Sequence, residues 1–355
     1  MAPNTTKQWS VVGKTGFDSL KFDEKAEIPK LGDHDVLVNF HYASLNFRDL
    51  IIPKGQYPFP VKYPVVPGSD GAGTVVATGP RVTRFKKGDH VLTLFNQTHL
   101  GGLITADDQL TGLGGAIDGS LRQYGAFEES GLVKMPTTLN FQQGSTLPCA
   151  ALTAWNGLYG VEGRRLMPGD TILTQGTGGV SMFALQFAKA AGARVIATTS
   201  SDAKADILKK LGADHIINYK NDPNWGETAK KLTPGGAGCA HILEVGGPKT
   251  MTQSIKAIKR EGIISIIGFL AGMPQEQPTF LECLNNTFTA RGVLVGSRQQ
   301  FEQMNLAIDA AGIKPIVDDK VFDLEDAKDA YQYMWDAKHF GKLTIKISDP
   351  GQSKL

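Results

Sequence analysis

The chain has 355 residues, of which 41 % are hydrophobic and 20 % are charged, and its formal net charge is +2. This length suggests two domains with full apolar cores. The nearly neutral charge offers no field that would attract nucleic acid or an anionic membrane. The cysteines, Cys149, Cys239 and Cys283, are odd in number and lack paired spacing. They argue for a reducing compartment and against a disulfide framework.

The first part of the chain, up to about residue 130, contains short strand-like runs that glycine and proline interrupt. Examples lie at 36–43, 73–79 and 88–95, and no long helical periodicity accompanies them. This pattern predicts a compact β-barrel-like domain. The glycine-rich stretch from about 95 to 120 is expected to form loops.

From about residue 131 to 296, strand-like and helix-like segments alternate. The expected strands lie at 171–174, 194–198, 215–219, 241–245, 263–268 and 292–296. The alternation predicts a doubly wound parallel sheet. The remaining residues begin with an amphipathic helical pattern and end in a strand at 342–347, and we expect them to rejoin the first domain.

A glycine turn between the strand at 171–174 and the following helix carries the main functional signal. Gly176, Gly178 and Gly179 form this turn. A dinucleotide pyrophosphate requires such a turn, because glycines let the backbone approach and the helix N-terminus supplies N–H groups and a positive dipole end. Ser181 replaces the usual third glycine and is small enough for that position. The alternative is an ordinary βαβ unit with a glycine-rich turn.

The residues after the expected strand at 194–198 indicate whether the dinucleotide is NAD or NADP. An NAD site normally has Asp or Glu about 20 residues after the turn, which binds the ribose 2′-hydroxyl. Here the tip carries Ser200 and Ser201, followed by Lys204. These hydroxyl and ammonium groups suit a 2′-phosphate, so we expect NADPH, with NADH possible. Asp202 is expected to cap a helix at 203–211, and the alternative is a solvated turn without a ligand role.

Several motifs together resemble the medium-chain dehydrogenase/reductase superfamily, over nearly the whole chain. They lie at 68–75 (GSDGAGTV), 84–91 (RFKKGDHV), 147–155 (LPCAALTAW), 175–181 and 211–219 (LGADHIINY). Within the superfamily the chain is most similar to the zinc-free quinone oxidoreductase-like branch. The resemblance implies an α/β fold with a GroES-like β-barrel catalytic domain over 1–130, rejoined by 297–355. It also implies a Rossmann domain, a doubly wound parallel sheet, over 131–296.

The positions that bind catalytic zinc in zinc-dependent relatives carry Asn46, Ser69 and Cys149 in this chain. Catalytic zinc normally needs three protein ligands, and an asparagine and a serine are poor replacements. We interpret Cys149 as a small buried residue. A four-cysteine cluster for structural zinc is also missing from the sequence, so we predict no metal.

Without a Lewis acid, hydride is delivered more easily to an already activated acceptor than to a simple ketone. We therefore expect an NADPH-dependent, zinc-independent oxidoreductase that reduces an activated C=C bond, in an enone or enoyl compound, or a quinone. An NADP-dependent alcohol dehydrogenase or carbonyl reductase is one alternative. A nucleotide-binding protein without catalysis is the other.

The resemblance implies three catalytic candidates. It places Asn46 by the nicotinamide ribose, Tyr57 as a proton donor, and Thr153 facing the nicotinamide. A phenol can donate because it is protonated at neutral pH. The alternatives are a turn-stabilising asparagine, an aromatic residue that closes a loop, and a threonine on a helix face. Arg48 and Asp49 could form a structural ion pair, which we prefer for Asp49.

The resemblance also implies the remaining cofactor contacts. They are Gly178, Gly179 and Val180 at the pyrophosphate, Tyr219 beside the adenine, and Gly246, Phe269, Phe340 and Lys342 along the cofactor.

Two further expectations concern partners. The family commonly dimerises through the edge strands of two Rossmann sheets, and an apolar strand at 289–297 would be a liability if exposed, so we expect a homodimer. The final residues, Ser353, Lys354 and Leu355, match a peroxisomal address that an import receptor reads. We therefore expect the peroxisome, and the cytoplasm otherwise, with a small-molecule substrate and neither nucleic acid nor membrane as a partner.

Overall fold

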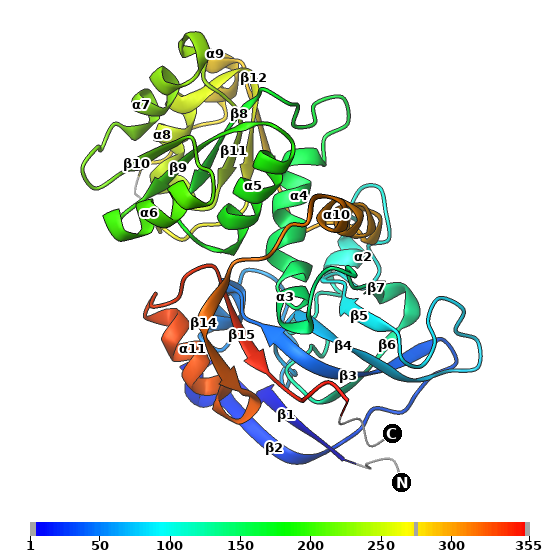
Figure 1. The fold of residues 1–355 in the computed structure, drawn as a ribbon. Helices are drawn as coiled ribbons and strands as arrows, with labels where there is room; N and C mark the ends of the chain where they lie inside the picture. Colours follow the sequence, from blue (N-terminus) through cyan, green and yellow to red (C-terminus); the bar gives the residue numbers. More distant parts are fainter. Residues whose placement is uncertain (1–4, 273–275, 352–355) are drawn as a thin grey trace. The chain divides into compact units, whose positions relative to one another are not determined.

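The computed structural model describes residues 5–272 and 276–351, which form two compact units (Figure 1). The first unit comprises Met1–Leu152 and Gly296–Leu355, and the second comprises Thr153–Val295. The proposed import signal at Ser353, Lys354 and Leu355 lies outside the described residues. Among the described residues, no helix is both long enough and apolar enough to cross a membrane.

The first unit is rich in β-structure, as the sequence predicts. Seven strands form one sheet in the order β14-β15-β3-β4-β5-β7, with β6 paired to β3, while β1 and β2 form an antiparallel pair. The strands are β1 (Thr5–Val11), β2 (Leu20–Glu27), β3 (Asp35–Ser44), β4 (Asp70–Thr78), β5 (His90–Thr93), β6 (Tyr124–Glu128), β7 (Leu132–Lys134), β14 (Val317–Asp323) and β15 (Lys342–Lys346). The helices are α1 (Phe47–Ile51), α2 (Ala106–Gln109), α3 (Phe141–Gly144), α10 (Arg298–Ala311) and α11 (Ala327–Trp335), with a π-helical turn η3 (Leu147–Ala151).

The C-terminal part of the chain completes this first sheet. Strand β15 pairs with β14 on one side and antiparallel with β3 on the other (Figure 1). Its apolar side chains, together with Phe40 of β3 and Tyr331 of α11, belong to one buried core. The expected return of the tail to the first domain therefore takes place through a strand inside the sheet.

The division between the units falls later than the sequence suggests. Strand β7 pairs antiparallel with β5, so residues just after 130 belong to the first sheet. Helix α3 and the turn η3 follow before the second unit begins at Thr153. The second unit, which the alternating pattern predicts to begin at residue 131, therefore begins about twenty residues later in the structure.

The second unit is a six-stranded parallel sheet in the order β10-β9-β8-β11-β12-β13. This order, with the first strand in the middle, is the doubly wound arrangement that the sequence predicts. The strands are β8 (Thr171–Gln175), β9 (Arg194–Thr199), β10 (His215–Asn218), β11 (Cys239–Glu244), β12 (Ile258–Ile266) and β13 (Thr289–Gly292). The helices are α4 (Leu152–Tyr159), α5 (Gly179–Ala190), α6 (Asp202–Lys210), α7 (Trp225–Leu232), α8 (Pro248–Ala257) and α9 (Leu281–Asn286).

Two local expectations for the second unit are wrong. The apolar run at 289–297 is not one long strand: β13 ends at Gly292, and Val295 has a φ of +50°, which a β-branched residue rarely adopts. Helix α6 begins at Asp202, so Ser201 and not Asp202 occupies the N-cap position. The Asp202 carboxylate instead accepts a hydrogen bond of 2.8 Å from the side chain of Asn218.

Candidate active site

The glycine turn of the second unit has the geometry of a phosphate-binding loop. Gly176 has a φ of +73°, and Gly178 is the N-cap of α5, which begins at Gly179. A Cβ atom on Gly178 would meet nothing within 4 Å, so the space before the helix is open. The first N–H groups of a helix lack intrahelical partners, and here they include Gly179 and Val180. The turn can therefore receive an anionic group at the positive end of the helix dipole.

Ser181 explains how this turn tolerates the loss of the third glycine. Its side chain is buried, and its hydroxyl donates a hydrogen bond of 2.7 Å to the carbonyl of Gln175. This hydrogen bond links the first turn of α5 to the end of β8, where helix and strand must pack closely.

A buried carboxylate that the sequence analysis missed lies at the end of β11. Glu244 accepts hydrogen bonds from the Gln175 amide at 2.7 Å, the Thr250 hydroxyl at 2.5 Å and the Gly247 N–H at 2.9 Å. The Ser254 hydroxyl is a fourth donor to it. Burial of an unpaired charge is strongly unfavourable, so these donors are what allow Glu244 to lie here.

The same network fixes the loop that contains Gly246. The side-chain oxygen of Gln175 accepts hydrogen bonds from the backbone N–H groups of Val245, at 3.1 Å, and Gly246, at 3.0 Å. The carboxyl ends of β8 and β11 are thereby joined at the edge of the sheet where nucleotides bind in such folds. An acidic residue at the end of an apolar strand was the available sequence signal.

The other candidates of the second unit lie at strand ends or in a helix. Ser200 and Ser201 follow β9 and are half-buried, and Lys204 lies in the first turn of α6. Tyr219 and Phe269, which follow β10 and β12, are each 42 % exposed. Except for Lys204, these residues follow the carboxyl ends of parallel strands, which is where nucleotides bind in such folds.

Thr153 is the second residue of α4 and its side chain is buried. It lies in the second unit, whereas Asn46, Tyr57, Phe340 and Lys342 lie in the first. The Phe340 N–H donates to the carboxylate of Asp318 at 2.7 Å, just before β15 begins.

In the first unit, Asn46 is held from three directions. It is the N-cap of α1, and its backbone N–H donates to the Asp49 carboxylate at 2.8 Å. Its side-chain oxygen accepts a hydrogen bond of 2.6 Å from Lys342, and its side-chain nitrogen donates to Ser69 at 3.4 Å. The carboxamide therefore belongs to a polar cluster and does not merely stabilise a turn.

That cluster contains a buried ion pair. The Lys342 ammonium lies 3.2 Å from the Asp70 carboxylate, and the two side chains are 4 % and 0 % exposed. Asp70 also accepts hydrogen bonds from Ser44, at 2.9 Å, and Ser69, at 2.7 Å. We call Asn46, Ser69, Asp70 and Lys342 the lysine cluster.

Burial raises the pKa of the Cys149 thiol, in η3, to about 12, and the charge of Asp70 adds to this shift. The residue is nevertheless half-buried and not fully buried as expected. A neutral thiol, rather than the thiolate that ligates metals, is the favoured form in this environment.

The residues of the lysine cluster do not fit a zinc site. Asn46 and Ser69 are engaged in hydrogen bonds, and the positive charge of Lys342 lies among the positions that would surround the metal. Within residues 5–272 and 276–351, no group of three or more His, Cys, Asp or Glu side chains could hold a metal ion. Asp70 and Cys149 are of the residue types that ligate zinc, whereas Asn46 and Ser69 are not, so these positions do not supply the three protein ligands that catalytic zinc requires.

Arg48 orients Tyr57. Its Nε donates to the phenol oxygen at 3.2 Å, and its guanidinium lies between the rings of Tyr57 and Phe95, 4.9 and 4.7 Å from their centroids. A guanidinium has only donors, so the phenol oxygen must accept this bond. The hydrogen of the phenol therefore remains available to another acceptor.

Asp49 forms the expected structural contacts. Its carboxylate lies 3.7 Å from the Arg48 guanidinium, and both groups are buried. Burial raises the pKa of Asp49 to about 6, although Arg48 opposes this shift.

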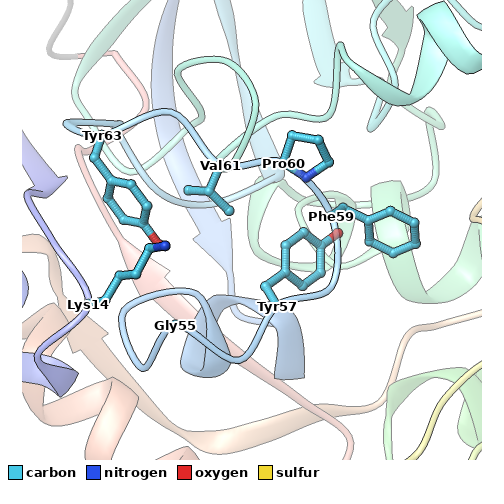
Figure 2. Close-up of a pocket in the computed structure, with 7 residues that line it drawn as sticks. All are labelled: Lys14, Gly55, Tyr57, Phe59, Pro60, Val61 and Tyr63. Carbon is cyan, nitrogen blue, oxygen red and sulfur yellow. The ribbon is translucent and has the colours of Figure 1, made fainter.

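Tyr57 also lines a cavity of about 190 Å³ (Figure 2). Figure 2 shows Lys14 beside Tyr63 on one side, and Tyr57 near Phe59 on the other. The walls are largely aromatic, with one cation at the margin. The volume is below the range of about 300–1,000 Å³ that is usual for complete ligand sites, so this cavity is not a complete ligand site by itself.

Family models match both halves of the chain. Residues 32–137 match the alcohol dehydrogenase GroES-like domain, and residues 179–310 match the zinc-binding dehydrogenase model. The zinc-type alcohol dehydrogenase-like protein of Schizosaccharomyces pombe is 48 % identical over 337 residues, which are 94 % of this chain and 96 % of that protein.

Solved structures agree in fold. The structure named "putative Alcohol dehydrogenase" from Sinorhizobium meliloti 1021 has a TM-score of 0.88 and 38 % identity, covering 98 % of this chain and 100 % of that one. A quinone oxidoreductase of Pseudomonas syringae has a TM-score of 0.79 and 26 % identity, covering 96 % and 99 %. The chain belongs to the medium-chain dehydrogenase/reductase superfamily and is a nicotinamide-dependent oxidoreductase with a GroES-like domain and a Rossmann domain.

Proposed function

We propose that this oxidoreductase uses NADPH, without zinc, to reduce a quinone or a C=C bond conjugated to a carbonyl group. The observation that carries the proposal is the Lys342 ammonium, which is buried beside Asn46, Ser69 and Asp70. This ammonium lies among the positions that would surround a metal, and its three N–H donors are taken by Leu45, Asn46 and Asp70, so it does not polarise a simple ketone as a Lewis acid would. An activated acceptor needs less polarisation.

The residues of the first unit supply the rest of the chemistry. The reduced nicotinamide, when bound, supplies hydride. Asn46 would donate hydrogen bonds through its amide nitrogen toward the cofactor or the developing enolate oxygen. Tyr57 would deliver the proton from its phenol oxygen, and the Arg48 guanidinium at 3.2 Å would stabilise the phenolate that remains.

The proposed preference for NADPH depends on the strand tip after β9. Ser200, Ser201 and Lys204 offer two hydroxyls and an ammonium at the position where NAD enzymes carry an acidic residue. The nearest acid, Asp202, is engaged with Asn218. This arrangement favours a 2′-phosphate over a free 2′-hydroxyl.

Two kinds of relatives define the competing possibilities. The relative from Schizosaccharomyces pombe and one structural neighbour are named as alcohol dehydrogenases or as similar to them, and another neighbour is a quinone oxidoreductase. Quinone oxidoreductase activity agrees better with the lysine cluster than alcohol dehydrogenase activity does. It also agrees with the resemblance of the sequence to the zinc-free quinone oxidoreductase-like branch. An alcohol dehydrogenase would instead require a metal or another strong electrophile at this position.

A steady-state screen separates these possibilities. The purified protein is assayed with NADPH and enones, quinones and enoyl thioesters, before and after exhaustive chelation, and with NADP and alcohols in the reverse direction. The proposal expects acceptor reduction that chelation leaves unchanged. Activity lost on chelation and restored by zinc would refute it, as would faster turnover of alcohols. Tight NADPH binding without turnover would instead indicate a non-catalytic nucleotide-binding protein.

We also propose that the chain forms a homodimer through β13, one of the two outermost strands of its parallel sheet. Phe280 and Leu284, at the start of α9 and within it just before β13 in the chain, are 93 % and 74 % exposed, and exposed apolar side chains and open sheet edges favour association. Light scattering of the wild type and of Phe280→Glu/Leu284→Glu tests this. A monomeric wild type would exclude it.

Peroxisomal import through Ser353, Lys354 and Leu355 is a separate proposal that depends on the motif. A fluorescent fusion at the N-terminus should enter peroxisomes and should lose this localisation when Leu355 is deleted. A fusion that stays diffuse with Leu355 present would exclude the proposal.

A further inference from the structure

Lys342 has no unused hydrogen-bond donor. Its Nζ donates to the backbone oxygen of Leu45 at 2.8 Å, the side-chain oxygen of Asn46 at 2.6 Å and the carboxylate of Asp70 at 3.2 Å. An ammonium has three N–H donors, so these three acceptors account for all of them. The side chain is 4 % exposed, and its place in the first residue of β15 fixes its approach.

This arrangement determines which way the Asn46 carboxamide is turned. The two ends of an asparagine amide look alike in shape, and their assignment depends on the partners. Because Lys342 offers only donors, the atom facing it must be the carbonyl oxygen. The amide nitrogen is then directed away from the ammonium, and its long 3.4 Å contact with Ser69 leaves it able to donate elsewhere.

We propose that Lys342 is a positioning residue that acts through Asn46. Its ammonium holds the carboxamide with the N–H groups presented for binding, and Asp70 compensates its charge. This inference rests on the proposed role of Asn46, and it differs from a direct contact between Lys342 and the cofactor.

A double-mutant cycle between Lys342 and Asn46 separates these two roles. The variants are Lys342→Met, Asn46→Ala and the double variant, each assayed for kcat, KM and the Kd of NADPH. A positioning residue is coupled to the group it positions, so Lys342→Met should lower kcat/KM about 10- to 100-fold alone and have almost no further effect in Asn46→Ala. Additive losses would overturn the proposal and indicate that Lys342 contacts the nucleotide itself.

Folding must be controlled, because Lys342→Met leaves Asp70 buried without its cation. Lys342→Met/Asp70→Asn removes both charges and should restore the melting temperature. If Lys342 acts only by neutralising Asp70, this variant also regains full activity, which would contradict a role in orienting Asn46. Lys346→Met, in the same strand but paired with Asp349 at the surface, is the matched control and should keep wild-type kinetics.

The Kd of NADPH is measured without an acceptor substrate, so this part of the result does not depend on which acceptor is chosen. A wild type that binds NADPH but reduces no acceptor would refute the proposed function. The cycle can still be completed on binding, where coupling between Lys342 and Asn46 supports the inference and additivity refutes it.

Discussion

Arg48 donates a hydrogen bond of 3.2 Å to the phenol oxygen of Tyr57 while its guanidinium covers the tyrosine ring. Arg48 belongs to α1 and Tyr57 to the loop after it. The partner of the phenol oxygen is thus a buried cation and not solvent. The contact gives Tyr57 one free hydrogen and a nearby positive charge. Both properties suit a proton donor.

Removal of the phenol hydroxyl tests this role. Tyr57→Phe is expected to lower kcat by about 10²- to 10⁴-fold, the usual contribution of a positioned acid, while the Kd of NADPH changes little. Tyr333→Phe, on α11, is a control that should keep wild-type kcat. An unchanged kcat in Tyr57→Phe would show that water, or another group, provides the proton.

Arg48→Met should destabilise the protein. Asp49 would lose its cation while it remains 1 % exposed, and the carbonyl of Leu113 would lose its 2.7 Å donor. The free energy of unfolding should fall by about 3–5 kcal/mol, as measured by urea denaturation.

Arg81→Met is the matched control, because Arg81 pairs with Asp33 at the surface and the loss should be below about 1 kcal/mol. Equal effects of Arg48→Met and Arg81→Met would contradict a structural role for the buried pair.

His41 should make the protein sensitive to acid. Burial lowers the pKa of His41 to about 4, from 6.5, while its ring nitrogens face Ser348 and Thr74 at 2.9 Å. At His41 the unfolded chain therefore binds more protons than the folded chain between about pH 6.5 and 4. The stability that His41 contributes is fully present above pH 6.5 and is lost as the pH falls through 4.

Urea denaturation at several pH values measures this slope. His41→Gln should reduce the slope between pH 4 and 6.5, although the contribution of His241, whose pKa burial also lowers to about 4, would remain. His34→Gln, at a side chain that is 54 % exposed, should leave the slope unchanged. A slope that His41→Gln leaves intact would assign the acid sensitivity to other groups.

Coenzyme preference should change with the strand tip after β9. Lys204→Gln should raise the KM of NADPH roughly 10- to 100-fold, because a hydrogen bond to a charged group contributes about 1.5–3 kcal/mol, and should leave NADH unaffected. Ser200→Glu adds a carboxylate that repels a 2′-phosphate and should reverse the preference. Lys209→Gln, on the exposed side of the same helix, is the control. No change in the NADPH/NADH ratio would disprove the phosphate site.

The sequence predicted the features that depend on neighbouring residues. The glycine turn at Gly176 and Gly178, the parallel sheet around it and helix α10 follow from local periodicity and backbone freedom, and the structure confirms them. The end of β13 was not predictable in the same way, because the apolar run continues while the backbone at Val295 leaves the extended conformation.

The contacts within the lysine cluster could not be predicted from the sequence pattern. Asn46 and Lys342 are separated by 296 positions, and each alone suggests only a turn residue or a cofactor contact. The donors around Glu244 likewise come from three different elements, β8, α8 and the loop before α8. Such clusters require knowledge of which strands are neighbours.

The position of β15 inside the first sheet has a consequence for biosynthesis. The second unit is encoded without interruption and can fold on the ribosome as soon as it emerges, whereas the end of β3 must wait for β15, which follows the whole second unit in the chain. Until then Tyr42, Ala43 and Ser44 of β3 lack the partner strand on the edge whose first half pairs with β6, and Asp70 has no ammonium beside it. Translation that stops shortly before Lys342 would therefore leave an aggregation-prone polypeptide instead of a slightly shortened enzyme.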